Sequence, residues 1–324
     1  MHTRTLAFAP RRSTLLVALL GLSGCGGAAT TTLPAQTSSL EPTEHSAPFL
    51  WRVESPDGRV SHLMGTIHGA VTLSEALPAP HDALLTTATS VHVESLPDDP
   101  QEIAAFGQRL MAPSARPLVA VLGLETMHGL VARFPSFPRE RLDALEPWAA
   151  FFVLLSLRVM EVLQQHAQQT GADAAAAENP GMDMAIIQQS RARQLPPHPL
   201  ERLTELADIF EGVDQAVYRE MLVEFATTDD AEDGSAEQMA QMVDAYRAGD
   251  LDAIAQLVDA LNTGEATAAF FRPLITQRNH LWMTRLPAIF NTGGAFVAVG
   301  AAHMPGPEGL VAQLRAAGFA VTRL

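Results

Sequence analysis

The sequence predicts an α/β fold in which one central β-sheet is built from both chain ends, with a large helical insertion between them. Strand-like apolar runs lie at residues 49–65, 89–95 and 293–300, and a last short one closes the chain at 319–324. Helical spacing dominates residues 100–290. A hydrophobic content of 47% in 324 residues is ample for one large core.

The first 24 residues are expected to be a secretory signal and are set aside from the fold. Three arginines precede "STLLVALLGL", an apolar segment too short to span a membrane. "LSGC" then places Cys25, the only cysteine, where it resembles the lipidated residue of a bacterial lipobox. An ordinary signal with a chance cysteine is the alternative. Residues 26–47 are small, polar and proline-containing, as in a flexible tether. We therefore expect an exported envelope protein, anchored through lipid alone and facing the periplasm or exterior.

The composition of the chain excludes several classes of function. No lysine occurs, so a P-loop lysine and Schiff-base chemistry are excluded. Apart from Cys25 there is no cysteine for a disulfide, a thiolate metal site or a nucleophile. The net charge of −15 becomes −18 without residues 1–24, and such an acidic chain disfavours nucleic acid as a partner.

The strands can be placed in order along the chain. Pro56-Asp57-Gly58 between two short runs predicts a hairpin. "TSVHVES" alternates, which puts His92 and Glu94 on one strand face. "GGAFVAVG" is continuously apolar, as expected of a central strand buried on both faces. A helix from near Pro307, ended by Gly318, then leads into the final strand and predicts a parallel crossover.

The middle of the chain contains several amphipathic segments and one that is apolar almost all round. The latter, residues 147–165, predicts a buried helix. A membrane span is the alternative, which Arg158 and Glu161 disfavour.

Two Gly-x-x-His motifs, Gly65 to His68 and Gly300 to His303, are the only ones in the chain and follow predicted strands at its two ends. A glycine there would let the backbone turn sharply. We expect both histidines on exposed turns at one edge of one sheet, together with Glu94. Two imidazoles and a carboxylate suit a divalent metal that activates water. Hydrogen-bonded turn histidines and a surface carboxylate are the alternatives.

A cationic candidate, Arg278, opens a predicted helix with Asn279 and Trp282. Its guanidinium is suited to hold a substrate carboxylate or a developing oxyanion, and a salt bridge at the helix end is the alternative.

Several segments together resemble the TraB/PrgY/GumN family, which is related to the TIKI metalloproteases. They are "LWRVESPDGRVSHLMGTIHGA", "SVHVES", "EPWAAFF", "GMDMAII", "PLERLTEL", "RNHLWM" and "FVAVGAAHMPGPEGLVAQLRAAGFAVTRL". The resemblance covers most of residues 48–324. It implies a manganese- or cobalt-type metallohydrolase that cleaves peptides, with zinc as a further possibility. It also implies a sheet core shared with erythromycin esterase and a haem-binding lipoprotein group.

The family's defining residues fall here on both motifs, on Glu94 and on Arg278. Glu201 resembles part of a Leu-Glu element and is a second catalytic candidate, although "RARQLPPHP" stands before it where the family commonly has a glycine-lysine stretch. We expect an envelope lipoprotein with a metal-dependent hydrolase site for a peptide or small molecule. A non-catalytic lipoprotein that captures a peptide or haem-like ligand, and a purely structural lipoprotein, are the alternatives.

Overall fold

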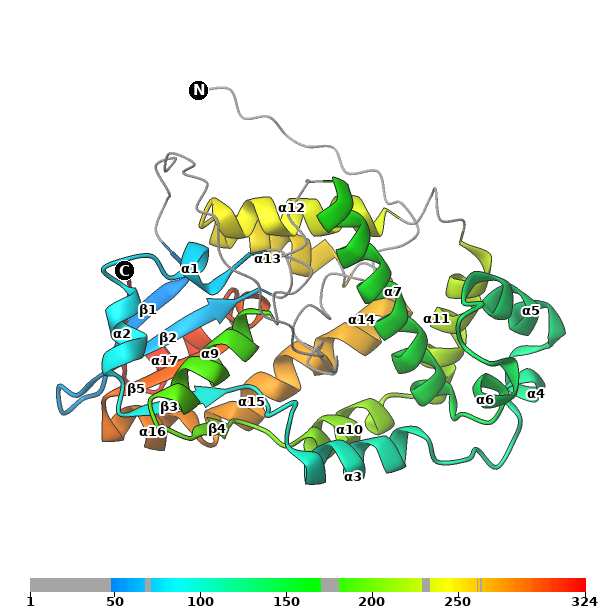
Figure 1. Cartoon of the computed structure of the whole chain (residues 1–324), viewed down its shortest axis with the longest axis horizontal. Helices are drawn as coiled ribbons and strands as arrows, with labels where there is room; N and C mark the ends of the chain where they lie inside the picture. Colours follow the sequence, from blue (N-terminus) through cyan, green and yellow to red (C-terminus); the bar gives the residue numbers. More distant parts are fainter. Residues whose placement is uncertain (1–47, 68–70, 170–180, 229–233, 261, 263) are drawn as a thin grey trace.

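The computed structural model describes residues 48–67, 71–169, 181–228, 234–260, 262 and 264–324. It has the expected α/β fold. One six-stranded sheet lies toward one end of the molecule, and most of the helices extend away from it (Figure 1). Residues 1–47, with the expected signal, Cys25 and the tether, lie outside the described residues, as do residues 68–70.

The sheet has the strand order β4-β3-β5-β2-β1-β6. Its strands are β1 (Leu50–Glu54), β2 (Val60–Thr66), β3 (Ser90–Val93), β4 (Pro197–Pro199), β5 (Ala295–Gly300) and β6 (Ala320–Arg323). β4, β3, β5 and β2 are mutually parallel, so their carboxyl ends meet at one edge of the sheet. β1 is antiparallel to both of its neighbours and forms the predicted hairpin with β2.

Strand β5 lies inside the sheet, between β3 and β2, and all six of its residues are buried. This confirms the central strand predicted from its continuous apolar run. After β5 the chain forms α17 (Leu310–Ala316) and then β6, which runs parallel to β5 but pairs with β1. The predicted parallel crossover is therefore present. Its helix begins at Leu310, after Gly309, and not near Pro307.

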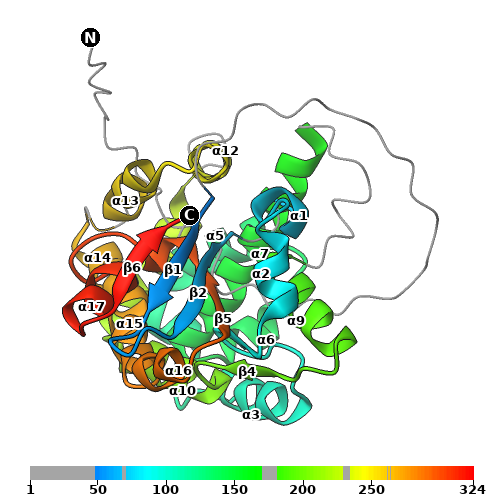
Figure 2. The ribbon, with the colours of Figure 1, turned by 90° about the vertical axis from the view of Figure 1, so that its left-hand side faces the viewer.

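The helices cover both faces of the sheet and build a separate layer beyond it. Figure 2 shows the strands in the middle of the molecule, with α1, α2 and α9 on one side and α15 and α17 on the other. The remaining elements are α1 (Leu73–Ala76), α2 (Asp82–Thr87), α3 (Pro100–Leu110), α4 (Leu118–Leu122), α5 (Leu124–Arg133), α6 (Arg139–Asp143), α7 (Pro147–Gln169), α9 (Met182–Ala192), α10 (Leu203–Gly212), α11 (Gln215–Thr227), α12 (Ser235–Arg247), α13 (Leu251–Ala260), α14 (Glu265–Arg272), the π-helical turn η2 (Pro273–Gln277), α15 (Arg278–Met283), α16 (Leu286–Thr292) and the 3₁₀ turn η3 (Ala301–His303).

The insertion between β3 and β5 is helical as predicted, with one exception. β4 lies within it and joins the sheet as an edge strand beside β3. The sheet is therefore not built from the two chain ends alone. β4 thereby brings Glu201 to the same sheet edge as the residues that follow β3 and β5.

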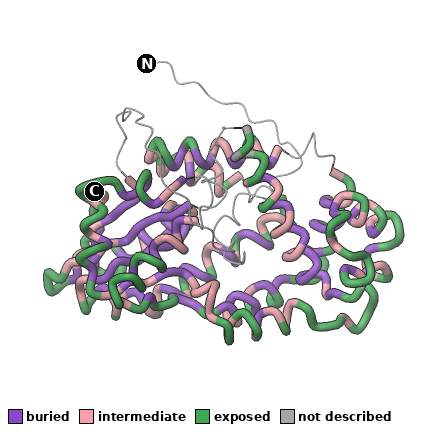
Figure 3. Tube along the Cα trace, viewed as in Figure 1, coloured by how far each residue is buried: buried purple, intermediate pink, exposed green. Residues whose placement is uncertain are grey.

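Helix α7 is a core helix of the helical layer. Trp148, Phe151, Leu154 and Val159 are each at most 3% exposed and belong to the main hydrophobic core, and the buried stretch is visible along α7 in Figure 3. Among the described residues it is also the one helix long and apolar enough to cross a membrane, over Pro147–Gln165, with 56% of that window buried. Burial within the protein accounts for this apolar sequence.

Candidate functional site

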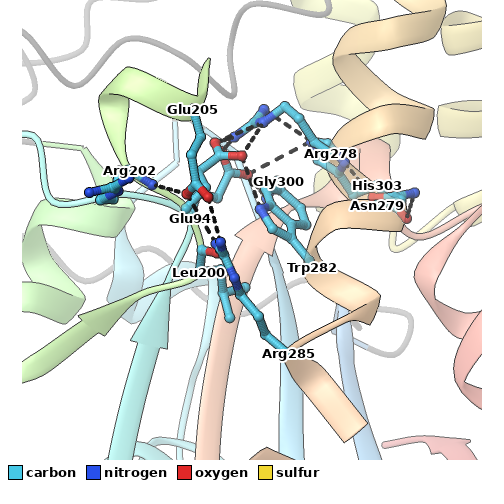
Figure 4. A network of polar contacts seen from close by, with 11 residues as sticks. Glu94, Leu200, Arg202, Glu205, Arg278, Asn279, Trp282, Arg285, Gly300 and His303 are labelled. Carbon is cyan, nitrogen blue, oxygen red and sulfur yellow. Dashed lines mark hydrogen bonds and ion pairs between the residues drawn. The ribbon is translucent and has the colours of Figure 1, made fainter. Parts of the chain in front are cut away.

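The candidate residues follow the carboxyl ends of the parallel strands, where ligands gather in sheets of this kind. Glu94 comes one residue after β3, Glu201 two residues after β4, and His303 three residues after β5. Arg278 approaches from the start of α15. We call Glu94, Glu201, Arg278 and His303 the carboxyl-edge cluster. All four are buried, and they converge as Figure 4 shows for its labelled members.

Arg278 bridges the two glutamates. Its Nη2 lies 2.6 Å from Glu201 Oε1 and 2.5 Å from Glu94 Oε2, and its Nε donates to Glu201 Oε1 at 2.9 Å. The side chain of Arg278 is 2% exposed, and those of Glu201 and Glu94 are 0% and 8% exposed. Charge-assisted bonds of this kind are the strong ones, and the planar guanidinium fixes the relative orientation of both carboxylates. Arg278 therefore does form a salt bridge at the start of its helix, as the alternative in the sequence analysis had it. Both partners of this salt bridge are members of the cluster.

His303 is held in one tautomer by Asn279. The Asn279 Nδ2 donates to the backbone carbonyls of His303 and Glu308, at 3.2 and 2.8 Å, so its Oδ1 is the atom that faces the ring. His303 Nδ1 lies 2.7 Å from this oxygen and must donate to it. The proton therefore sits on Nδ1, and Nε2 keeps its lone pair.

The Nε2 of His303 faces the rest of the cluster. It lies 3.3 Å from Arg278 Nη1, which donates to it, and 4.0 Å from Glu94 Oε1. Burial, reinforced by the Arg278 charge, lowers the pKa of His303 to about 3. The imidazole is therefore neutral near pH 7. This corrects the expectation of an exposed turn, because His303 is 2% exposed.

Trp282 forms one wall of the cluster. Its Nε1–H donates to Glu201 Oε2 at 3.0 Å, and its ring centroid lies 4.7 Å from the Arg278 guanidinium carbon and 4.5 Å from the His303 ring. Trp282 follows Arg278 by four residues on α15, so both project from one helix face. One short helix thus supplies the cation, the residue that orients the histidine and the aromatic wall.

The motif glycines act differently from what the sequence suggested. Gly300 has φ −52°, which any residue adopts, and its N–H donates to Glu94 Oε1 at 2.6 Å. Gly65 lies inside β2, and a Cβ there would be 3.2 Å from Ala301 Cα and 3.3 Å from Phe49 Cβ. Gly65 therefore permits a close approach of chains, and neither glycine is needed for a left-handed turn.

The cluster carries one negative charge in excess when both carboxylates are ionised, since Arg278 is its only cation and His303 is neutral. Burial raises the pKa of Glu201 and the Glu94 charge adds to this, although Arg278 opposes it. Burial also disfavours the charged form of Arg278, but the two glutamates outweigh it and raise its pKa. A proton, a metal cation or a cationic group of a ligand would balance the charge.

A comparison with protein-family models places these residues in context. The model of the TraB/PrgY/gumN family matches residues 49–323, nearly the whole described chain. The chain belongs to the TraB/PrgY/gumN family. Searches of curated proteins and of solved structures gave no match. The match confirms the resemblance inferred from the sequence segments, and it covers both Gly-x-x-His motifs and every member of the carboxyl-edge cluster.

The first Gly-x-x-His motif of this TraB/PrgY/gumN chain is only partly described. β2 pairs with β5 in parallel, with Gly65 opposite Val299 and Thr66 opposite Gly300, so both motifs begin at the same edge of the sheet. His68 itself lies outside the described residues. Its position beside His303 stays a prediction.

The cluster offers two donor atoms suited to a divalent metal. His303 Nε2 and Glu94 Oε1 are 4.0 Å apart, and an imidazole nitrogen and a carboxylate oxygen are donor types that a divalent ion takes. Among the residues that the structure describes, no group of three His, Cys, Asp or Glu side chains forms a complete metal site. The donor chemistry therefore fits two ligands of the expected set, with His68 as the third candidate. Arg278 Nη1 shares the lone pair of His303 that a metal would use.

Three residues contact the cluster or a motif glycine without having been predicted to do so from the sequence: Asn279, Trp282 and Tyr246. The first two lie in "RNHLWM", which carried part of the family resemblance, and their spacing from Arg278 places them on its helix. Tyr246, whose hydroxyl bonds the Gly65 carbonyl from 181 residues away, left no local signal.

Proposed function

We propose that the chain is a metal-dependent hydrolase of the cell envelope, acting on peptides at the carboxyl-edge cluster. The observation that carries the proposal is the neutral His303, whose proton-free Nε2 faces Glu94 Oε1 at 4.0 Å. His303, Glu94 and His68 would hold the ion, of manganese or cobalt type or alternatively zinc. Such an ion lowers the pKa of a bound water and polarises a carbonyl.

The chain's own residues have separate roles in this proposal. Asn279 keeps the proton of His303 on Nδ1, so Nε2 carries the lone pair that a metal ligand needs. Arg278 Nη1 donates to His303 Nε2 in this structure, so an ion bound through that lone pair would displace this N–H. Arg278 would then be suited to stabilise the negative charge that develops on the substrate oxygen. Glu201 holds Arg278 in place. Glu94 acts as a ligand or, alternatively, as the general base that takes a proton from the attacking water.

Metal binding and hydrolysis by the full chain, purified in detergent, test the proposal. We expect bound Mn²⁺ or Co²⁺ in the wild type, a rise in Tm on metal addition, and cleavage within a panel of peptides and esters. His303→Gln removes the ligand nitrogen and is expected to abolish both metal binding and turnover. His280→Gln is the matched control, because His280 is exposed and bonds only Glu308. Full activity of His303→Gln would refute the mechanism.

A non-catalytic ligand-binding lipoprotein is the second candidate. The observation that favours it is the burial of every described cluster member, together with the contacts that Arg278 already makes to both glutamates and to His303. A protein that captures a haem-like or peptide ligand through His303 would show a spectral change on haem titration without any hydrolysis. A wild-type chain with hydrolysis and no haem spectrum excludes it.

A further inference from the structure

The end of β2 is held by a side chain from a distant helix. Tyr246, on α12, donates its hydroxyl to the Gly65 carbonyl at 2.7 Å. The Gly65 N–H in turn donates to the Phe49 carbonyl at 2.7 Å. Both polar groups of this motif glycine are thus fixed by contacts outside the β2–β5 ladder.

The Tyr246 ring is itself tightly fixed. It stacks on Phe49, with ring centroids 4.8 Å apart and planes inclined by 9°. Its hydroxyl also lies 3.6 Å from Met182 Sδ at the start of α9. Tyr246 is 5% exposed, and burial raises the pKa of its hydroxyl, so the group keeps the proton that it donates. One side chain on α12 therefore joins α9 and Phe49, the residue before β1, to the carboxyl end of β2.

We infer that Tyr246 is a positioning residue for the first Gly-x-x-His motif. Gly65 is the first residue of this motif and lies one residue before the carboxyl end of β2. By holding its carbonyl, Tyr246 fixes the direction in which the chain leaves the strand and enters the rest of the motif. The inference rests on the proposed function for its catalytic consequence, whereas its structural consequence can be measured without any activity.

The chain provides its own matched control. It has two tyrosines, and the other, Tyr218, is also fully buried and donates to a backbone carbonyl, that of Phe210, at 2.6 Å. Tyr246→Phe and Tyr218→Phe each remove one hydroxyl and one hydrogen bond of the same kind. Both should lower Tm by about 2–4 °C, since such bonds have similar net worth. Only the first touches the motif.

Hydrogen–deuterium exchange of the full chain tests the structural part. We expect amides of the segment 62–68 to exchange about tenfold faster in Tyr246→Phe, and to be unchanged in Tyr218→Phe. Equal exchange of this segment in the wild type and both variants would overturn the inference.

Titration with Mn²⁺ alone and turnover of the best peptide substrate test the catalytic part. Loss of a residue that orients a ligand typically costs 10–100-fold in metal affinity or activity. We expect about tenfold weaker Mn²⁺ binding and a fall in kcat with little change in KM for Tyr246→Phe, and wild-type values for Tyr218→Phe. Unchanged metal affinity and kcat in Tyr246→Phe would also overturn the inference. A wild type that binds no metal and cleaves nothing refutes the proposed function instead, and exchange then decides the positioning alone.

Discussion

Arg278 is the one cation of the carboxyl-edge cluster, and its removal would leave two carboxylates buried beside each other. Arg278→Met keeps the apolar stem but removes the charge, and breaking a buried pair in this way costs about 3–5 kcal/mol. Glu201→Gln leaves Arg278 paired with Glu94 and keeps an oxygen for the Trp282 N–H, so we expect a smaller loss of about 1–3 kcal/mol.

The double variant should show a reversal of sign. Without Arg278, the buried charge of Glu201 has no cation beside it and destabilises the fold. Glu201→Gln should therefore stabilise the Arg278→Met protein by about 1 kcal/mol or more, the order of magnitude of such coupling. Urea unfolding of the wild type, both single variants and the double variant measures this coupling. Simple additivity of the two losses would mean that the two side chains do not interact as the structure shows.

At the residue scale the sequence predicted side chains that the structure brings together, but not their surroundings. Glu94, Arg278 and His303 were identified from a Gly-x-x-His motif, an alternating strand and a helix start, together with the family resemblance. The exposure of His303 was predicted wrongly, because the covering groups, Asn279 and Trp282, reach it only through packing of α15 against the sheet edge. A tertiary contact of this kind cannot be predicted from the local sequence.

Among the elements, β4 shows where pattern reading fails. Its sequence is Pro-His-Pro, and proline cannot donate to a strand ladder, so the segment does not resemble a strand. The structure places it at the sheet edge, where proline is tolerated. β1, β2 and β5 were predicted correctly because a tight turn and continuous apolar residues are strong local signals.

Glu201 lies in the connection between β4 and α10. An ion pair fixes this connection. Arg285 bonds the Leu200 carbonyl and pairs with Glu205, whose Oε2 accepts from the Arg202 N–H as a helix cap. Burial raises the pKa of Glu205, but hydrogen bonds from Arg285 and Arg202 outweigh it, so the pKa lies below the ordinary value of a glutamate. A carboxyl with a lowered pKa stabilises the fold above its unfolded pKa, and this contribution is lost as pH falls through the folded value.

Glu205→Gln should therefore lower stability by about 0.5–1 kcal/mol at pH 7, and the difference from the wild type should shrink as pH falls toward 3. Thermal unfolding from pH 7 to 3 measures it. Glu211→Gln is the control on the same helix, since Glu211 pairs with Arg109 away from Leu200. Faster amide exchange at residues 199–203 is expected for Glu205→Gln alone. A stability difference between Glu205→Gln and the wild type that grows as pH falls would contradict the lowered pKa of Glu205.

Taken as a whole, the molecule brings residues from four separated chain segments to one sheet edge. The family match over residues 49–323 and the parallel pairing of β2 with β5 show why the two chain ends belong to one unit. The sequence predicted that the two chain ends join in one sheet, because both ends contain strand-like apolar runs. It could not predict Tyr246, because a contact across 181 residues depends on how the helical layer folds back.

The attachment of the whole molecule to a membrane depends on Cys25 in our proposal. The alternative internal anchor is α7, the one described helix long and apolar enough to span, and its apolar residues pack into the protein core. A core helix cannot leave the fold without exposing that core, so we propose lipid on Cys25, and not α7, as the anchor. Cys25→Ser should therefore release the full-length chain from the membrane fraction, with an unchanged Tm. Fractionation with immunodetection, alongside Ser23→Ala as a nearby control, measures this. A Cys25→Ser chain that stays with the membranes as the wild type does would exclude the lipid anchor and favour α7 as the anchor.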